Sequence, residues 1–191
     1  MATRAETAAA TRRALLEAAG ALLDAGGPEA VTLREVGARA GVSRSAPYRH
    51  FTGKESLLTE LATRAWDEVG DTLQALAASP ELSAHERLRA ALTAYTAIGR
   101  SRPYLYRLMF TTPASDPTAA VRAAARSQDL FLQLVAGVVG PAGSAEFAAL
   151  LLTSAHGITG LELSGHLGFD KWRTDADALL DLLISLLPSD A

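Results

Sequence analysis

The sequence has no cysteine among its 191 residues. This absence excludes disulfide bonds, thiolate catalysis, cysteine-based zinc sites and thiol redox switches, and it fits a reducing compartment. The chain also lacks a long apolar run, because no segment reaches the roughly 18 apolar residues of a membrane-spanning helix. The nearest candidate, residues 147–161, contains Thr, Ser, His and Gly. The sequence therefore predicts no membrane-spanning helix.

The first twenty residues do not have the pattern of an export signal. The first residues, MATRAETAAATRRALLEAAG, contain no continuous apolar region and no cleavage site after one. Charged side chains interrupt this segment at Glu6, Arg12, Arg13 and Glu17. Because a secretory signal needs both features, we expect a cytoplasmic protein with no membrane partner.

Positive charge is scarce in the chain as a whole, but it is unevenly distributed. The formal net charge is −3. Residues 1–54 carry eight Lys or Arg against five Asp or Glu, a balance of +3, whereas residues 55–191 carry ten against sixteen, a balance of −6. A positive head on an acidic body concentrates attraction to phosphate at one end of the protein.

Strict alternation of apolar and polar residues is absent, and the apolar spacing is helical nearly everywhere. The pattern predicts an all-α protein of about nine helices with no sheet. The expected helices cover residues 11–25, 32–40, 44–50, 53–78, 83–99, 103–111, 117–139, 144–164 and 174–187. We divide the chain into two domains, residues 1–54 and residues 55–191, because its length allows one large or two small domains.

Residues 32–54 predict two short helices joined by a tight turn. Thr32 and Glu35 form a Thr-x-x-Glu capping box at the start of the first helix. Gly41 suits the left-handed residue that ends this helix, and Ser43 is a candidate N-cap for a second helix over residues 44–50. The short turn sets the angle between the helices, as in a helix-turn-helix motif.

The second helix is expected to be short and to be anchored at its end. Pro47 is expected to be tolerated near its start, and Phe51 is expected to be buried after its last residue. Thr52 and Glu55 form another Thr-x-x-Glu box, which predicts a third helix with Lys54 near its start.

The segment AGVSRSAPYRHFTGKESLL resembles the helix-turn-helix signature of the TetR family of bacterial transcriptional regulators. The matching positions are Thr32, Ala40 to Ser43, Tyr48, His50, Phe51 and Lys54. Ser45 and Pro47 stand where many members have Gly and Leu. The resemblance implies a three-helix N-terminal DNA-binding domain, a C-terminal helical bundle for ligand binding and dimerisation, a palindromic double-stranded DNA operator and an unidentified small-molecule effector.

A second resemblance lies in the C-terminal half. PYLYRLMF, residues 103–110, and AHGITGLELSG, residues 155–165, are similar to a TetR-family C-terminal subtype that has a His-Gly pair. A Trp usually precedes that pair closely, whereas this chain has Thr153, Ser154 and Ala155 there.

The candidate DNA-binding residues divide by chemistry into two groups. A helix in the major groove contacts base edges with its N-terminal residues, so Arg44, Ser45 and Ala46 are candidate base readers, and Arg34 is a further one. Hydroxyl, ring and cationic groups suited to phosphate oxygens occur at Thr32, Ser43, Tyr48, Arg49, His50 and Lys54. The alternatives are ordinary solvated charges for the arginines and a core-edge position for His50.

The candidate ligand-binding residues are aromatic or carry a polar group. They are Trp66, Tyr95, Tyr106, Met109, Phe110, Phe131 and His156. Such side chains can line an apolar pocket with a few hydrogen-bonding groups, although each can equally belong to an ordinary core. His156 is a candidate for either ligand binding or a dimer interface.

The last two predicted helices are more apolar than one buried stripe requires. Residues 150–152 and most of residues 179–187 are apolar. We expect these helices to form a homodimer interface.

Two alternative functions explain the sequence less completely. A di-iron enzyme needs paired Glu-x-x-His motifs, which are absent; Glu162 and His166, four apart on one expected helix, could bind a metal weakly. The sequence also lacks a Ser/His/Asp pattern, a glycine-rich phosphate loop and zinc-ligand spacing. A protein-interaction module would explain the apolar C-terminal helices but not residues 32–54. The sequence therefore predicts a ligand-responsive transcriptional repressor, not an enzyme, with no cofactor.

Overall fold

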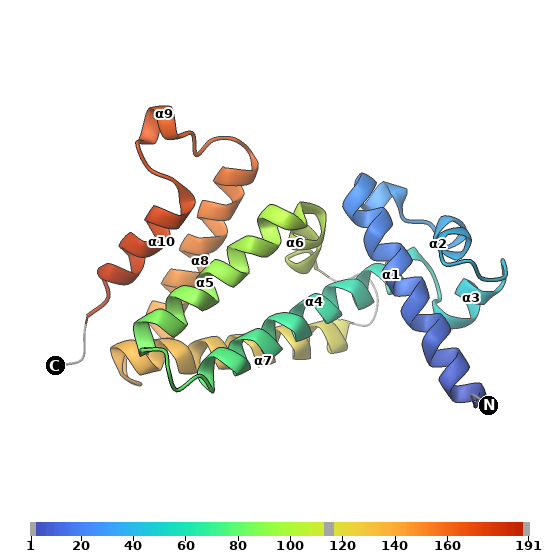
Figure 1. Cartoon of the computed structure of the whole chain (residues 1–191), viewed down its shortest axis with the longest axis horizontal. Coiled ribbons are helices and arrows are strands. Elements are labelled where there is room, and N and C mark those ends of the chain that lie inside the picture. Colours follow the sequence, from blue (N-terminus) through green and yellow to red (C-terminus); the bar gives the residue numbers. More distant parts are fainter. Residues whose placement is uncertain (1–2, 113–116, 189–191) are drawn as a thin grey trace. The chain divides into compact units, whose positions relative to one another are not determined.

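The computed structural model describes residues 3–112 and 117–188, and in these residues it contains ten helices and no strand (Figure 1). The helices are α1 (Arg4–Ala30), α2 (Leu33–Arg39), α3 (Ala46–His50), α4 (Lys54–Ala77), α5 (Ala84–Ser101), α6 (Pro103–Met109), α7 (Pro117–Val139), α8 (Ser144–Leu163), α9 (Phe169–Trp172) and α10 (Ala176–Ser185). The predicted fold class is confirmed. The additional helix is α9, a single turn of four residues that is too short to show a period in the sequence.

The chain forms two compact units. The first contains Met1–Ala65 and Tyr104–Val121, and the second contains Trp66–Pro103 and Arg122–Ala191. Helices α4 and α7 each contribute residues to both units. The predicted domains, residues 1–54 and residues 55–191, have other bounds than these units, and the predicted division stays a prediction.

Helix α1 starts earlier and ends later than predicted. Thr3 caps it, and Thr3 and Glu6 form a capping box that the sequence interpretation missed. The predicted stop is present as a break, because Gly26 and Gly27 leave helical geometry and Gly27 has φ +69°. A Cβ at Gly27 would lie 2.8 Å from Cε1 of Tyr104, so this glycine allows α6 to pack against the break in α1.

The turn between α2 and α3 agrees in part with the prediction. Thr32 caps α2, since its hydroxyl accepts from the amide of Glu35 at 3.1 Å, and Gly41 has φ +68°. The Glu35 carboxylate does not complete the capping box; it accepts from the guanidinium of Arg34 at 2.9 Å.

The predicted start of α3 is wrong. The helix begins at Ala46, and its N-cap is Ser45, not Ser43. A helix capped by Ser43 would need an amide at Pro47 to donate to the Ser43 carbonyl, and proline has none. The Ser43 carbonyl instead accepts from the Ala46 amide at 2.9 Å, and Pro47 falls in the first turn, where its missing amide costs nothing.

The start of α4 also differs in its hydrogen bonding. The helix begins at Lys54, and the Gly53 amide donates to the hydroxyl of Ser56 at 3.3 Å. This contact takes the place of the predicted box between Thr52 and Glu55.

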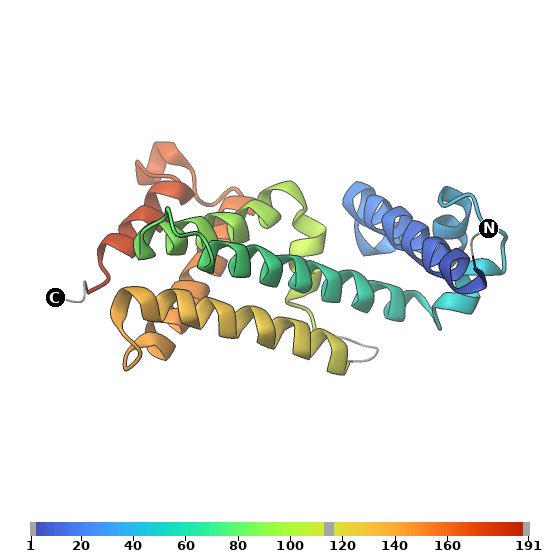
Figure 2. The same cartoon turned by 60° about the horizontal axis from the view of Figure 1, so that its bottom comes forward.

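In the second unit, α5, α8 and α10 pack against one another, and α7 runs beside α4 (Figures 1 and 2). Arg89 of α5 pairs with Asp181 of α10, where Nη2 and Oδ2 are 3.0 Å apart. Arg100 of α5 joins Glu162 of α8 at 2.9 Å and Asp177 of α10 at 3.1 Å. Two arginines of α5 therefore pair with carboxylates of α10.

In the described part of the chain, no single helix is long and apolar enough to cross a membrane. Among residues 3–112 and 117–188, one pair of helices, Thr118–Val139 and Ser144–Leu163, meets the length and composition requirements jointly, and it is bent by 113°.

Candidate functional site

The α2–α3 segment separates its apolar side chains from its polar ones. Leu33 and Val36 of α2 and Pro47 of α3 are buried, and Phe51 is buried just after α3. Gly37 is also buried, and a Cβ there would lie 2.8 Å from Cγ of Pro47. The proline ring therefore packs on the glycine at the point where the two helices approach. This contact fixes the geometry of the turn, and the sequence interpretation did not find it.

Most of the predicted DNA-binding residues lie on the exposed side of this segment. The exposed ones are Thr32, Arg34, Ser43, Arg44, Ser45, Tyr48 and Arg49, whereas His50 and Lys54 are half-buried. Tyr48 is 63% exposed, which is unusual for an aromatic residue that has no external contact to make.

Ala46 differs from the other predicted base readers because it is buried. It is only 3% exposed, because it is the first residue of α3 and faces the core of the motif. Its methyl group offers almost no surface to a base edge, whereas Arg44 and Ser45 are exposed candidate readers at this end of α3.

Three of these residues border one open hollow of about 590 Å³. Arg34, Arg44 and Tyr48 line it together with Glu35 and Val42. Arg34 is held by the neighbouring Glu35 carboxylate, and Lys54 Nζ lies 3.6 Å from a Glu29 carboxylate oxygen. Both pairs involve at least one well-exposed partner, so they are weak and can exchange for a phosphate.

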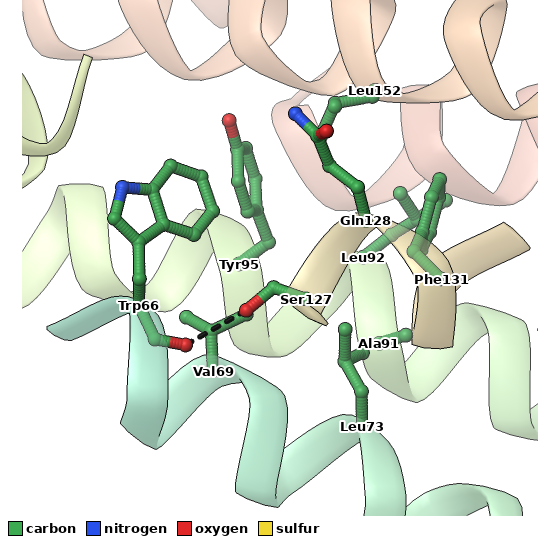
Figure 3. A pocket seen from close by; sticks show the side chains of 10 residues that line it. All are labelled: Trp66, Val69, Leu73, Ala91, Leu92, Tyr95, Ser127, Gln128, Phe131 and Leu152. Carbon is green, nitrogen blue, oxygen red and sulfur yellow. Dashed lines mark hydrogen bonds between the residues drawn. The ribbon is translucent and has the colours of Figure 1, made fainter. Parts of the chain in front are cut away.

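A cavity in the second unit brings together part of the predicted ligand-binding set. Trp66, Tyr95 and Phe131 line it from α4, α5 and α7 (Figure 3). The remaining lining residues are Val69, Leu73, Ala91, Leu92, Ser127, Gln128 and Leu152. None of the lining side chains is charged. The sequence interpretation missed Ser127 and Gln128, because polar residues on an otherwise amphipathic helix have no distinctive pattern.

The cavity is small, and a hydrogen bond joins two of the helices that line it. Its volume is about 30 Å³, room for very few water molecules. The Ser127 hydroxyl donates to the Trp66 backbone carbonyl at 2.8 Å and so ties α7 to α4 (Figure 3). A neighbouring groove of about 160 Å³ between α4 and α5 shares Val69, Leu73, Ala91 and Tyr95 with it. The shared side chains form a wall between the two spaces.

The other predicted ligand-binding residues do not line this cavity. Tyr106, Met109 and Phe110 belong to the first unit, where the rings of Tyr106 and Phe110 have centroids 5.2 Å apart. His156 is exposed on α8. Spacing along the chain could not distinguish these positions from those of Trp66, Tyr95 and Phe131, because all lie on apolar or aromatic helical segments.

The side of α8 that carries His156 is exposed along its length, and it carries Leu150, Gly157, Gly160 and Leu161. Nothing else in the described structure lies within 4 Å of a Cβ built at Gly157 or Gly160, so no other described helix packs closely against these two glycines. On α10 the exposed large apolar residue is Leu182, and Leu186 follows the helix.

The metal-binding alternative loses its geometric basis. Helix α8 ends at Leu163, so Glu162 and His166 do not share a helix, and Glu162 accepts from Arg100. The described residues contain no group of three or more His, Asp or Glu side chains that could hold a metal ion.

Comparisons with known proteins agree with this geometry. Residues 15–61 match the profile of the bacterial regulatory proteins of the tetR family, and residues 88–187, more than half of the chain, match the profile of the tetracyclin repressor-like C-terminal domain. No curated protein matches the sequence significantly.

Solved structures share the fold over nearly the whole chain. A protein of unknown function from Rhodococcus sp. RHA1 is 28% identical, with a TM-score of 0.77 over 93% of this chain and 95% of that one. A TetR family transcription regulator from Marinobacter aquaeolei VT8 is 22% identical, with a TM-score of 0.65 over 94% and 96%. SmeT, in its triclosan complex, is 19% identical, with a TM-score of 0.63 over 92% and 90%.

The subtype with the His-Gly pair, here His156 and Gly157, stays a prediction. The family is shown by the two matched profiles and agrees with the α2–α3 motif and the helical body. The chain belongs to the TetR family of bacterial transcriptional regulators, which are DNA-binding transcription factors and not enzymes.

Proposed function

We propose that this regulator is a cytoplasmic repressor that binds a palindromic operator as a homodimer and is released by a small, uncharged apolar or aromatic effector. The observation that carries the proposal is the exposed polar side of the α2–α3 segment, set on a buried apolar side that fixes its shape. Arg44 is the principal base reader, with Ser45 beside it and Arg34 as a further reader. Thr32, Ser43, Tyr48, Arg49, His50 and Lys54 contact phosphates and set the register.

The dimer is proposed to form through α8 and α10. Their exposed leucines and the open glycines of α8 offer an apolar surface that a second copy can approach closely. A symmetric dimer presents two α3 helices to successive major grooves about 34 Å apart, which is why the operator is expected to be palindromic. Leu182→Glu places a charge in this surface and should give monomers that lose operator affinity by on the order of 10²–10⁴-fold.

The effector is proposed to bind among Trp66, Tyr95 and Phe131. Because the lining carries no charge, it favours a neutral ligand, and Ser127 and Gln128 can supply hydrogen bonds. SmeT, a protein of the same fold, has been solved with triclosan, a small aromatic molecule, which makes triclosan a rational first probe. The present cavity is too small for such a ligand, so binding must displace lining side chains or a helix.

Helix α4 supplies a physical route for release. Lys54 lies at its first residue, and Trp66, Val69 and Leu73 of the same continuous helix line the cavity. A ligand that shifts α4 by an ångström or two would change the spacing of the two α3 helices in the dimer, and several DNA contacts would be lost together.

The DNA-binding part of the proposal can be tested with a random duplex library. Repeated selection with the wild-type chain should enrich one palindromic duplex, bound roughly 10³-fold or more tightly than a scrambled duplex of equal length. Affinity for both duplexes should fall steeply as salt increases. Enrichment of no sequence, or equal affinity for the enriched and scrambled duplexes, would refute sequence-specific DNA binding.

A further inference from the structure

Arg12, on α1, makes three contacts, two at the C-terminal end of α3 and one with α4. Its Nη1 donates to the backbone carbonyl of His50 at 3.0 Å, and its guanidinium carbon lies 4.7 Å from the centroid of the Phe51 ring. Its Nη2 lies 3.3 Å from a carboxylate oxygen of Glu60 on α4. All four residues belong to the first compact unit. One side chain thus joins α1, α3 and α4.

These contacts matter because α3 cannot hold its own orientation. It has five residues, fewer than an isolated helix needs to be stable, so tertiary contacts decide where it points. The His50 carbonyl is at the helix C-terminus, where carbonyls have no partner within the helix. A planar guanidinium can serve that carbonyl and a carboxylate at once while it stacks on a ring, whereas an ammonium group presents a single charged point.

We propose that Arg12 is a positioning residue for sequence-specific DNA binding, which fixes the direction of α3 without contacting the bases. Contacts to base edges depend on the direction of α3 more strictly than contacts from flexible cations to phosphates do. Loosening the C-terminal end of α3 therefore costs preference for the operator before it costs general affinity for DNA. This inference rests on the proposed DNA-reading role of Arg44 and Ser45.

Arg64 is a matched control. Its Nε lies 3.6 Å from the other carboxylate oxygen of Glu60, and its side chain is 41% exposed, against 38% for Arg12. Within the described part of the chain, the ion pair of Arg64 is with Glu60 on its own helix and not with α3. Arg64→Ala and Arg12→Ala remove the same charge from the same carboxylate, but only Arg12→Ala removes the hold on α3.

The experiment compares wild type, Arg12→Ala, Arg12→Lys and Arg64→Ala on two DNA duplexes, the one enriched by the wild type and a scrambled duplex of the same composition. Affinities are measured well below the unfolding temperature of each variant. Arg12→Ala should lower the ratio of specific to non-specific affinity by roughly tenfold, the size of one lost base contact. Arg64→Ala should leave the ratio within about twofold, because its side chain does not hold α3.

Arg12→Lys keeps the charge and decides the case even if Arg12→Ala does not fold. It should lose most of the specificity ratio, because a single ammonium cannot hold the His50 carbonyl, Glu60 and the Phe51 ring together. A lysine variant with the wild-type ratio, or equal ratio changes for Arg12→Ala and Arg64→Ala, would overturn the positioning role. A wild type with no preference for any duplex would instead overturn the proposed DNA reading itself.

Discussion

The α2–α3 segment and the cavity of the second unit differ in whether their candidate functional residues are exposed or buried. On the surface, the candidate contact residues, such as Arg44 and Tyr48, are exposed, while the residues that fix the motif, such as Pro47 and Phe51, are buried. In the cavity, Trp66, Tyr95 and Phe131 are themselves part of the core, each less than a tenth exposed. The proposed contacts to DNA can therefore be changed without changing the fold, whereas the proposed ligand-binding residues cannot.

The largest expected effect tests the second half of this comparison. Phe131→Ala should lower the free energy of unfolding by about 3–5 kcal/mol, because it removes a buried ring and leaves a larger cavity. The same variant should change ligand affinity, so function and stability move together. Chemical denaturation measures the loss. A loss below about 1 kcal/mol would indicate that the cavity walls are not a packed core.

Substitutions on the DNA-binding surface should separate the two properties. Arg44→Ala should cost about 1–3 kcal/mol of operator binding and relax preference at one base position, whereas Lys54→Ala should weaken all sequences alike and lower the salt slope by about one. Arg44→Ala should leave the unfolding free energy within about 0.5 kcal/mol, since the side chain is exposed. Mobility shifts over a panel of duplexes measure both effects. A change of preferred sequence in Lys54→Ala but not in Arg44→Ala would reverse the assignment.

Gly157→Ala should have a smaller effect, which stabilises the monomer but weakens its association into a dimer. The position is open within the chain, so alanine should stabilise the monomer by about 0.5–1 kcal/mol through helix propensity. If a second copy covers this side of α8, the added methyl should weaken the dimer. Sedimentation measures association. A dimer as tight as the wild type would place the interface elsewhere.

The smallest effect concerns pH. The hydrogen bond from Arg89 lowers the pKa of Asp181 below its ordinary value. Because the folded pKa lies below the unfolded one, about 3.9, this stabilisation is present above that pH and is lost as pH falls through the folded pKa. Asp181→Asn should therefore be slightly less stable than the wild type at neutral pH and equal to it in strong acid. A difference that persists in strong acid would assign the effect to packing of α10.

The sequence predicted the DNA-binding motif well because local chemistry decides it. The Thr32 cap, the left-handed Gly41 and the buried Phe51 each follow from a residue and its near neighbours. The predicted start of α3 was wrong because Pro47 was placed four residues after the N-cap, where the helix needs its amide. In the structure Pro47 lies two residues after the N-cap Ser45, where no amide is needed.

The cavity could be predicted only in part, since it depends on which residues of different helices meet. Trp66 and Ser127 are 61 positions apart in the chain, and only the packing of α7 on α4 brings them together. Tyr106 and Phe110 have equally suitable side chains, but Tyr106 lies on α6 and Phe110 directly follows it, both in the other unit. Likewise, Arg12 is an ordinary helical arginine in the sequence, and its position against His50 appears only in three dimensions.

The most direct test of the account measures how operator DNA changes the binding of a small apolar ligand. The chain has two tryptophans, so a Trp172→Phe variant leaves Trp66 as the only indole. Trp66 is 7% exposed and lines the cavity, whereas Trp172 is 55% exposed. A ligand found by screening, beginning with triclosan, is titrated with and without the enriched duplex. Linkage requires that the duplex weaken ligand binding by the same factor by which the ligand weakens DNA binding. The coupling free energy that corresponds to this factor is typically about 1–3 kcal/mol. Equal ligand affinity with and without DNA would show that the cavity does not control the DNA-binding surface.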